Sequence, residues 1–179
     1  MEFNEVAASR RSIRKYDGTR KVTEEQIREM IGCAIYAPSW KNTQTARYYV
    51  AYSAEMIEKV RGALPAFNNK STEGASAYIV TAVKANVSGY EKDGTPTTEL
   101  DNNAWGIYDL GMHNQNLILK AAELGLGTLV MGIRDVSVLK EIFEIPEEQI
   151  VVSVIAVGYP DIDAKMPPRK SVEDIAVIR

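Results

Sequence analysis

The sequence is poor in the residues that most often carry metal or nucleophilic chemistry. Its 179 residues include one cysteine, Cys33, and one histidine, His113. A single cysteine excludes an internal disulfide and any multi-cysteine metal site, and a single histidine argues against zinc, so we expect no bound metal. A cysteine–histidine nucleophilic pair would have to join these two residues, yet Cys33 lies in an apolar, helix-like stretch. If the chain is an enzyme, a bound organic cofactor is the natural source of its chemistry.

Long hydrophobic runs and an excess of basic charge are also missing. No window approaches the roughly 18 consecutive apolar residues of a membrane-spanning helix. The opening stretch MEFNEVAASRR holds no apolar run of signal-peptide length, and the net charge of −3 argues against a general nucleic-acid binder. Neither a G-x-x-x-x-G-K-[ST] phosphate loop nor a G-x-G-x-x-G fingerprint occurs. We therefore expect a cytoplasmic protein with no nucleic-acid or membrane partner.

The composition is that of a globular protein. Hydrophobic residues make up 45% of the chain and charged residues 25%, and the length favours a single domain over residues 1–179. Residues 63–74 and 86–99 are predicted to be loops, the first of them mobile. Helices are predicted over residues 2–10, 23–37, 54–62, 101–124 and 136–143, and strands over 48–52, 77–83, 128–133 and 151–157. This order lacks a clean βαβ alternation, which favours an α+β layered fold over a doubly wound sheet.

The longest predicted helix, residues 101–124, has two apolar stripes. One stripe consists of Leu110, Leu117, Ala121 and Leu124, and the other of Trp105, Tyr108, Met112, Leu119 and Ala122. A helix that is apolar on two sides is buried on most of its surface. The pattern therefore predicts either a central helix or a helix at a subunit interface.

Two basic segments lie at opposite ends of the chain. Residues 10–14, Arg-Arg-Ser-Ile-Arg, group three guanidiniums and a hydroxyl, and guanidiniums bind phosphate bidentately. Residues 167–170, Pro-Pro-Arg-Lys, could add a second phosphate clamp. Taken alone, each also fits a solvated basic surface, as at the C-terminal end of a helix.

Two further segments could contact a ligand. Residues 37–44, Ala-Pro-Ser-Trp-Lys-Asn-Thr-Gln, place hydroxyl, amide and ammonium groups in one loop that could bind the polar edge of a heterocycle. Residues 125–132 contain a Gly-x-Gly that follows a helix and enters a strand, which is the reverse of the dinucleotide-binding context. The backbone of residues 131–133 could nevertheless lie against a ligand. An ordinary polar loop and an ordinary core strand remain the alternatives.

Taken together and in this order, four longer stretches resemble the FMN-dependent nitroreductase family. They are RRSIRKYD, APSWKNTQ, DLGMHNQNLILKAAELGLGTLVMG and GYPDIDAKMPPRKSVEDI, and they span nearly the whole chain. The resemblance implies a central, mostly antiparallel sheet flanked by helices, in an intertwined homodimer with FMN at the interface. One departure is that Gln44 is followed by Thr45-Ala46, where the family usually has proline and an aromatic residue.

The resemblance also implies roles for particular residues. The ribityl phosphate would be held by Arg10, Ser12, Arg14 and Arg169, and Arg11 would lie near the flavin's polar edge or the ribityl chain. Further flavin contacts, some of them from the other subunit, would come from Pro38, Ser39, Asn42 and Gln44. Met131, Gly132 and Ile133 would lie along the isoalloxazine ring near N5. Candidate stacking residues in the substrate pocket are Trp40, Phe67 and Trp105, each of which could instead pack in the core.

The implied activity is transfer of electrons from NADH or NADPH, through FMN, to nitroaromatics, quinones or similar acceptors by a ping-pong mechanism. In such an enzyme the flavin carries the chemistry and no side-chain acid or base is required. The same architecture also serves dehalogenation, flavin fragmentation and azoline oxidation. A non-catalytic FMN carrier is a further alternative, which reduction of the bound flavin by a nicotinamide would separate from an enzyme.

Overall fold

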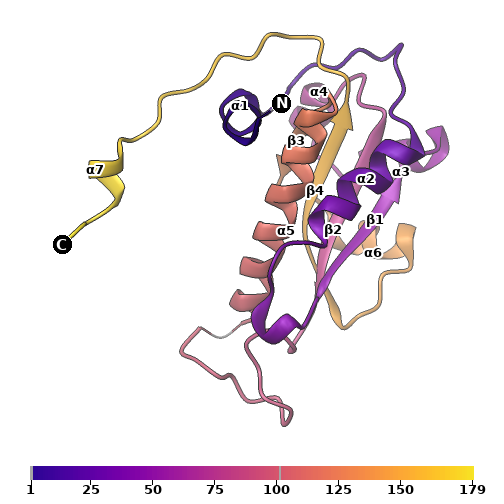
Figure 1. Ribbon diagram of the computed structural model, residues 1–179. Coiled ribbons are helices and arrows are strands. Elements are labelled where there is room, and N and C mark those ends of the chain that lie inside the picture. Colours follow the sequence, from indigo (N-terminus) through magenta and orange to yellow (C-terminus); the bar gives the residue numbers. More distant parts are fainter. Residues whose placement is uncertain (1, 101) are drawn as a thin grey trace.

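A four-stranded antiparallel sheet forms the centre of the structure (Figure 1). The computed structural model describes residues 2–100 and 102–179. The strands are β1 (Ala46–Ala51), β2 (Ala77–Lys84), β3 (Gly127–Met131) and β4 (Gln149–Gly158), and their order across the sheet is β1-β2-β4-β3. The inner strands β2 and β4 carry runs of valine, isoleucine and alanine that are buried on both faces. The edges of the sheet are therefore β1 and β3.

Helices cover both faces of this sheet. They are α1 (Phe3–Ser9), α2 (Glu24–Ala34), the 3-10 helix η1 (Trp40–Asn42), α3 (Ala54–Gly62), α4 (Ala66–Ser71), α5 (Ala104–Glu123), α6 (Val136–Phe143) and α7 (Val172–Ile175). One hydrophobic cluster joins α2 and α5 to one face of the sheet, and a second cluster joins α3 and α6 to the other face. Successive residues of β2 alternate between the two: Tyr78 and Val80 belong to one cluster, and Ala77 and Ile79 to the other. The structure confirms the predicted α+β fold with an antiparallel sheet.

The start of α2 follows from its sequence. The Thr23 hydroxyl accepts a hydrogen bond from the Gln26 backbone at 3.2 Å, and the Gln26 side chain accepts one from the Thr23 backbone at 3.0 Å. This capping box satisfies two N–H groups that a helix start leaves free. Ile27 and Met30 then recur at helical spacing and are buried against the sheet and α5.

Helix α5 is buried on one side only. Leu110, Leu117 and Ala121 of the first apolar stripe are buried in the chain's own core. On the second stripe, by contrast, Tyr108 is 61% exposed. Ile107, its neighbour in the chain, is 41% exposed. The chain's own core thus covers one of the two stripes and leaves much of the other at the surface.

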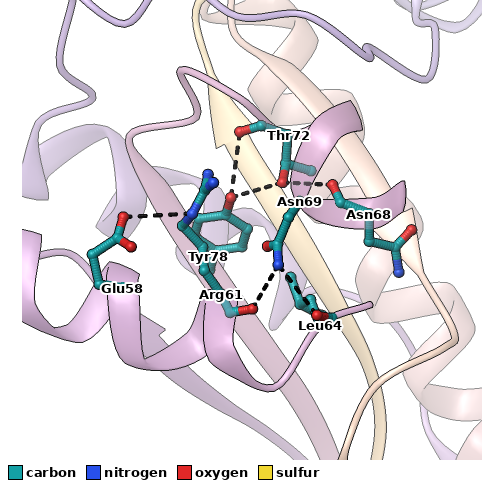
Figure 2. Close-up of polar contacts among 7 residues, drawn as sticks. All are labelled: Glu58, Arg61, Leu64, Asn68, Asn69, Thr72 and Tyr78. Atoms are coloured by element: carbon teal, nitrogen blue, oxygen red, sulfur yellow. Dashed lines mark hydrogen bonds and ion pairs between the residues drawn. The ribbon is translucent and has the colours of Figure 1, made fainter. Parts of the chain in front are cut away.

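The prediction of a mobile loop over residues 63–74 was wrong, because helix α4 lies within it. Polar side chains stabilise this helix in place of an apolar stripe (Figure 2). The Asn69 amide donates to the carbonyls of Arg61 and Leu64 at 2.9 and 3.2 Å, which ties α4 to the end of α3. The Tyr78 hydroxyl donates to the Thr72 hydroxyl at 2.8 Å, which ties α4 to β2. Asparagines that read as loop residues in the sequence therefore act as helix anchors.

Beyond β4 the chain runs away from the sheet as an extended arm that ends in α7 and the C-terminus (Figure 1). Apolar side chains on this arm are strongly exposed, among them Ile175 at 73% and Ile178 at 87%. Within the part of the chain that the structure describes, no helix is long and apolar enough to cross a membrane.

Candidate functional site

The segment Arg10–Arg14 lies along the open edge of β3. Ser12 forms a parallel bridge with Thr128, and the Ile13 N–H donates to the Thr128 carbonyl at 2.9 Å. Gly127 makes this approach possible, because a Cβ there would lie 2.6 Å from the Ile13 side chain. The first basic segment is thereby fixed to the sheet.

The C-terminal arm brings the second basic segment to the same place. Arg10, Arg11, Ser12 and Arg14 line a cavity of about 360 Å³, whose other wall is formed by residues 164–167 and Arg169. The two ends of the chain therefore meet, as the phosphate hypothesis requires. Lys170 is not among the residues that line this cavity.

The cavity carries positive charge that no carboxylate neutralises. Among the described residues, no acidic side chain forms an ion pair with Arg10, Arg14 or Arg169. Partial burial lowers the pKa of Arg10 below its usual value, and the charges of Arg11 and Arg169 lower it further. Arg11 also donates to the carbonyls of Ala8 and Arg10 at 2.6 and 2.8 Å, and so braces the end of α1. Guanidiniums gathered without counter-ions are suited to bind a phosphate dianion.

Free backbone donors lie farther along the same edge. The segment Met131–Ile133 ends β3 and leads out of the sheet. Among the residues that the structure describes, no protein acceptor pairs with the N–H of Gly132 or Ile133. Gly132 lies about 13 Å along the chain from Thr128, at roughly 3.3 Å per residue. One sheet edge thus presents a cationic pocket and, beyond it, backbone N–H groups.

This chemistry fits FMN. A terminal phosphate matches the arginine cavity, and the polar edge of a flat heterocycle matches the unpaired N–H groups. No atom comes within 4 Å of a Cβ built on Gly132, so the backbone there is open to a ligand. The ribityl chain would span the distance between the two.

The loop at residues 38–44 lies at the opposite edge of the sheet, beside β1. It precedes β1, and Ala46 at the start of β1 pairs with Val83 near the end of β2. Because β1 and β3 are opposite edges, three strand spacings separate them, or about 14 Å. Within one chain the structure therefore does not bring Pro38, Ser39, Asn42 and Gln44 together with the arginine cavity.

Comparison with known proteins places the chain in a family. Residues 7–159 match the family model described as Nitroreductase family. The chain belongs to the nitroreductase family. An archaeal relative, from Archaeoglobus fulgidus and provisionally named an NADH dehydrogenase/NAD(P)H nitroreductase, is 31% identical over 156 residues, which are 85% of this chain and 82% of the relative. This membership makes the chain an oxidoreductase.

Two other nitroreductases extend the comparison. The oxygen-insensitive NAD(P)H nitroreductase of Enterobacter cloacae is 24% identical over 93% of this chain and 94% of its own. A provisionally named nitroreductase from Exiguobacterium sibiricum, crystallised in complex with FMN, superposes with a TM-score of 0.85 at 23% identity, covering 100% of this chain and 98% of its own. The fold is thus that of the nitroreductases.

Two of the three candidate stacking residues of this nitroreductase meet each other. The ring centroids of Trp40 and Trp105 are 4.7 Å apart, and Tyr108 lies edge-on to Trp105 at 5.7 Å. Phe67 is 56% exposed on α4, which Asn69 ties to the end of α3. Trp40 and Trp105 therefore belong to one aromatic cluster, and Phe67 is not part of it.

Sequence reasoning missed Asp109, which holds the loop at residues 38–44. This carboxylate is buried, and it accepts hydrogen bonds from the backbone N–H of Trp40 at 3.0 Å and from the Ser88 hydroxyl at 2.5 Å. The loop is strained, since Lys41, Asn42 and Gln44 all have positive φ. An acidic residue beside Leu110 in the buried stripe of α5 was the available signal.

Proposed function

We propose that this nitroreductase binds FMN along the open edge of β3 and passes electrons from NADH or NADPH to nitroaromatics, quinones or similar acceptors. The observation that carries the proposal is the arginine cavity without counter-ions, on the same sheet edge as the free N–H groups of Gly132 and Ile133. The cofactor is FMN, with which the Exiguobacterium sibiricum protein was crystallised, and the donor is a reduced nicotinamide, as in the name of the Enterobacter cloacae enzyme.

Each part of the site has one task. Arg10, Ser12, Arg14 and Arg169 bind the phosphate, and Arg11 holds the end of α1 beside them. The backbone of Met131–Ile133 orients the ring by hydrogen bonding. When bound, FMN supplies the redox chemistry by accepting a hydride and delivering electrons to the acceptor. The protein contributes position and electrostatics, so no side chain has to act as an acid or base.

The proposal includes a homodimer in which the loop at residues 38–44 of one copy completes the flavin site of the other. Its support is that this loop and the arginine cavity lie on opposite sheet edges of one chain. Tyr108 on α5 and Tyr36 after α2 are exposed, and an apolar pocket of about 320 Å³ opens between α1, α2 and α5. A second copy would cover these surfaces and give the extended C-terminal arm a surface to pack on.

Donor and acceptor use the same site in turn. Hydride transfer needs the reacting atoms about 3–3.5 Å apart in aligned geometry. If one face of a flavin bound at the β3 edge rested on the protein, only the other face would be open to planar partners, and two of them could not both reach that distance. The nicotinamide therefore leaves before the acceptor enters.

Steady-state kinetics test this part of the proposal. Initial rates measured against NADH or NADPH, at several fixed concentrations of a quinone, should give parallel double-reciprocal lines. Anaerobic addition of the nicotinamide alone should bleach the flavin, and the quinone should restore its colour. Intersecting lines with a ternary complex would contradict the shared site, and a flavin that no nicotinamide bleaches would identify a carrier instead of an enzyme.

A further inference from the structure

Two side chains hold the turn that follows β3. The Asn68 amide, from α4, donates to the Ile133 carbonyl at 3.0 Å. The Arg134 guanidinium donates to the carbonyls of Gly132 and of Val151, which lies on the neighbouring strand β4. Two consecutive carbonyls of the turn are therefore held, one by a side chain of α4 and the other by a side chain of the turn itself that is bonded to β4.

Asn68 is itself held rigidly (Figure 2). It is buried, and its backbone carbonyl accepts a hydrogen bond from the Thr72 hydroxyl at 2.8 Å. That hydroxyl accepts in turn from Tyr78 at 2.8 Å, and both Thr72 and Tyr78 are completely buried. Hydrogen bonds thus lead from Tyr78, near the start of β2, through Thr72 to the backbone of Asn68, whose side chain contacts Ile133.

Peptide planarity turns these contacts into a direction for the free donors. In a trans peptide the C=O and the next N–H point in opposite directions. The Gly132 carbonyl is held toward β4 by Arg134, so the Ile133 N–H points away from β4. The Thr128 carbonyl accepts from Ile13 and so points away from β4, and because backbone groups alternate along a strand, the N–H of Gly132 points away from β4 as well. Both free donors therefore face the open edge of the sheet.

We propose that Asn68 and Arg134 are positioning residues that aim the N–H groups of Gly132 and Ile133 at the flavin ring. The inference rests on the proposed flavin site and adds to it two residues that do not touch the cofactor. N–H donors stabilise added negative charge, so a well-aimed pair favours reduced over oxidised flavin. Loss of this orientation of the N–H groups should weaken the binding of reduced FMN more than that of oxidised FMN.

Two adjacent asparagines on α4 provide a matched test. Asn68→Leu removes the contact to Ile133, whereas Asn69→Leu removes only the contacts to Arg61 and Leu64 at the end of α3. We expect Asn68→Leu to weaken reduced FMN about tenfold more than oxidised FMN, which lowers the two-electron midpoint potential by about 30 mV. Asn69→Leu should lower the melting temperature and leave the potential unchanged. In ¹H–¹⁵N spectra of the flavin-free protein, only Asn68→Leu should shift the amide signals of Gly132 and Ile133.

A second variant and the wild type make every outcome decisive. Arg134→Lys replaces the forked guanidinium, which bonds two carbonyls, by a single ammonium, and it should also lower the midpoint potential. The Arg134→Lys variant takes the place of Asn68→Leu if Asn68→Leu does not fold. An unchanged potential, or the same shift in Asn69→Leu, would overturn the positioning role while FMN still binds. A wild type that takes up no FMN would instead refute the proposed function, and the positioning role with it.

Discussion

At the scale of single residues, the proposed phosphate site depends most on Arg10 and Arg169, which reach one cavity from opposite ends of the chain. Replacing either by alanine should weaken FMN binding about 10- to 100-fold, because a charge-assisted hydrogen bond contributes roughly 1.5–3 kcal/mol. Arg28→Ala is the control, since Arg28 pairs with Glu24 at 2.6 Å on the exposed side of α2. Fluorescence titration with FMN measures all three, and equal losses would disprove the phosphate assignment.

His113 predicts a dependence of stability on pH. It is buried on α5, where neither ring nitrogen has a partner among the described residues. Burial lowers its pKa below the usual 6.5, and the charge of Asp109 opposes this effect only in part. The unfolded chain therefore binds a proton at a pH where the folded chain does not, and stability falls as the pH drops through about 6.5.

The test compares the wild type with His113→Gln, which cannot titrate. Between about pH 7.5 and about pH 5.5, the free energy of unfolding of the wild type should fall more steeply than that of the variant. Urea unfolding at each pH, at one protein concentration, supplies both curves. Parallel curves would show that His113 titrates alike in the folded and unfolded states.

At the scale of elements, the buried stripe of α5 joins the helix to the sheet. Leu117 is fully buried in the cluster that α5 shares with α2, β2 and β4. Leu117→Ala should cost about 2–5 kcal/mol of unfolding free energy, because it leaves a cavity in a packed core. Gln115→Ala, two residues away on the exposed side of the helix, should change it by less than about 0.5 kcal/mol. Chemical unfolding measures both, and similar losses would place the core elsewhere.

Elements with strong periodicity were predictable from sequence. The helix over residues 136–143 was predicted with the bounds of α6, and the β-branched run at 151–157 with nearly those of β4. Helix α4 was not, because its anchors Asn69 and Thr72 contact Arg61 of α3 and Tyr78 of β2, and contacts between neighbouring elements leave no helical periodicity in the sequence. The tertiary structure overrides a local loop signal there.

The candidate site was predictable in outline. Arg10, Ser12, Arg14 and Arg169 were expected at one phosphate, and the structure places them around one cavity. The separation of residues 38–44 from that cavity depends on strand order, which local sequence does not give. The roles of Asn68 and Asp109 likewise depend on contacts between distant elements. The flavin contacts of the individual residues, and the single domain over residues 1–179, stay predictions.

At the scale of the whole molecule, a shared site can be tested by mixing chains. One variant, Arg10→Ala with Arg169→Ala, lacks the phosphate contacts, and the other, Asn42→Ala with Gln44→Ala, lacks the contacts proposed to come from the partner. Each alone should be a dimer in sedimentation that binds FMN weakly. After exchange of subunits, half of the dimers are mixed and hold one intact site each, so about a quarter of all sites should regain tight binding.

The mixing experiment separates two arrangements. If each flavin were held by one chain alone, the variant with Asn42→Ala and Gln44→Ala would bind FMN tightly before mixing, because within one chain these residues lie far from the arginine cavity, and exchange of subunits would create no new tight site. A stable monomer that binds FMN with full affinity would contradict the dimer directly.

The central claim is that the arginine cavity and the β3 edge hold FMN by its phosphate. Titration of the flavin-free protein with FMN and, in parallel, with riboflavin tests it most directly, because the two differ only in that phosphate. We expect a flavin absorbance spectrum with FMN, and an affinity for riboflavin at least about a hundredfold weaker, since several charge-assisted hydrogen bonds are lost together. Equal affinities for the two flavins, or no uptake of FMN at all, would contradict it.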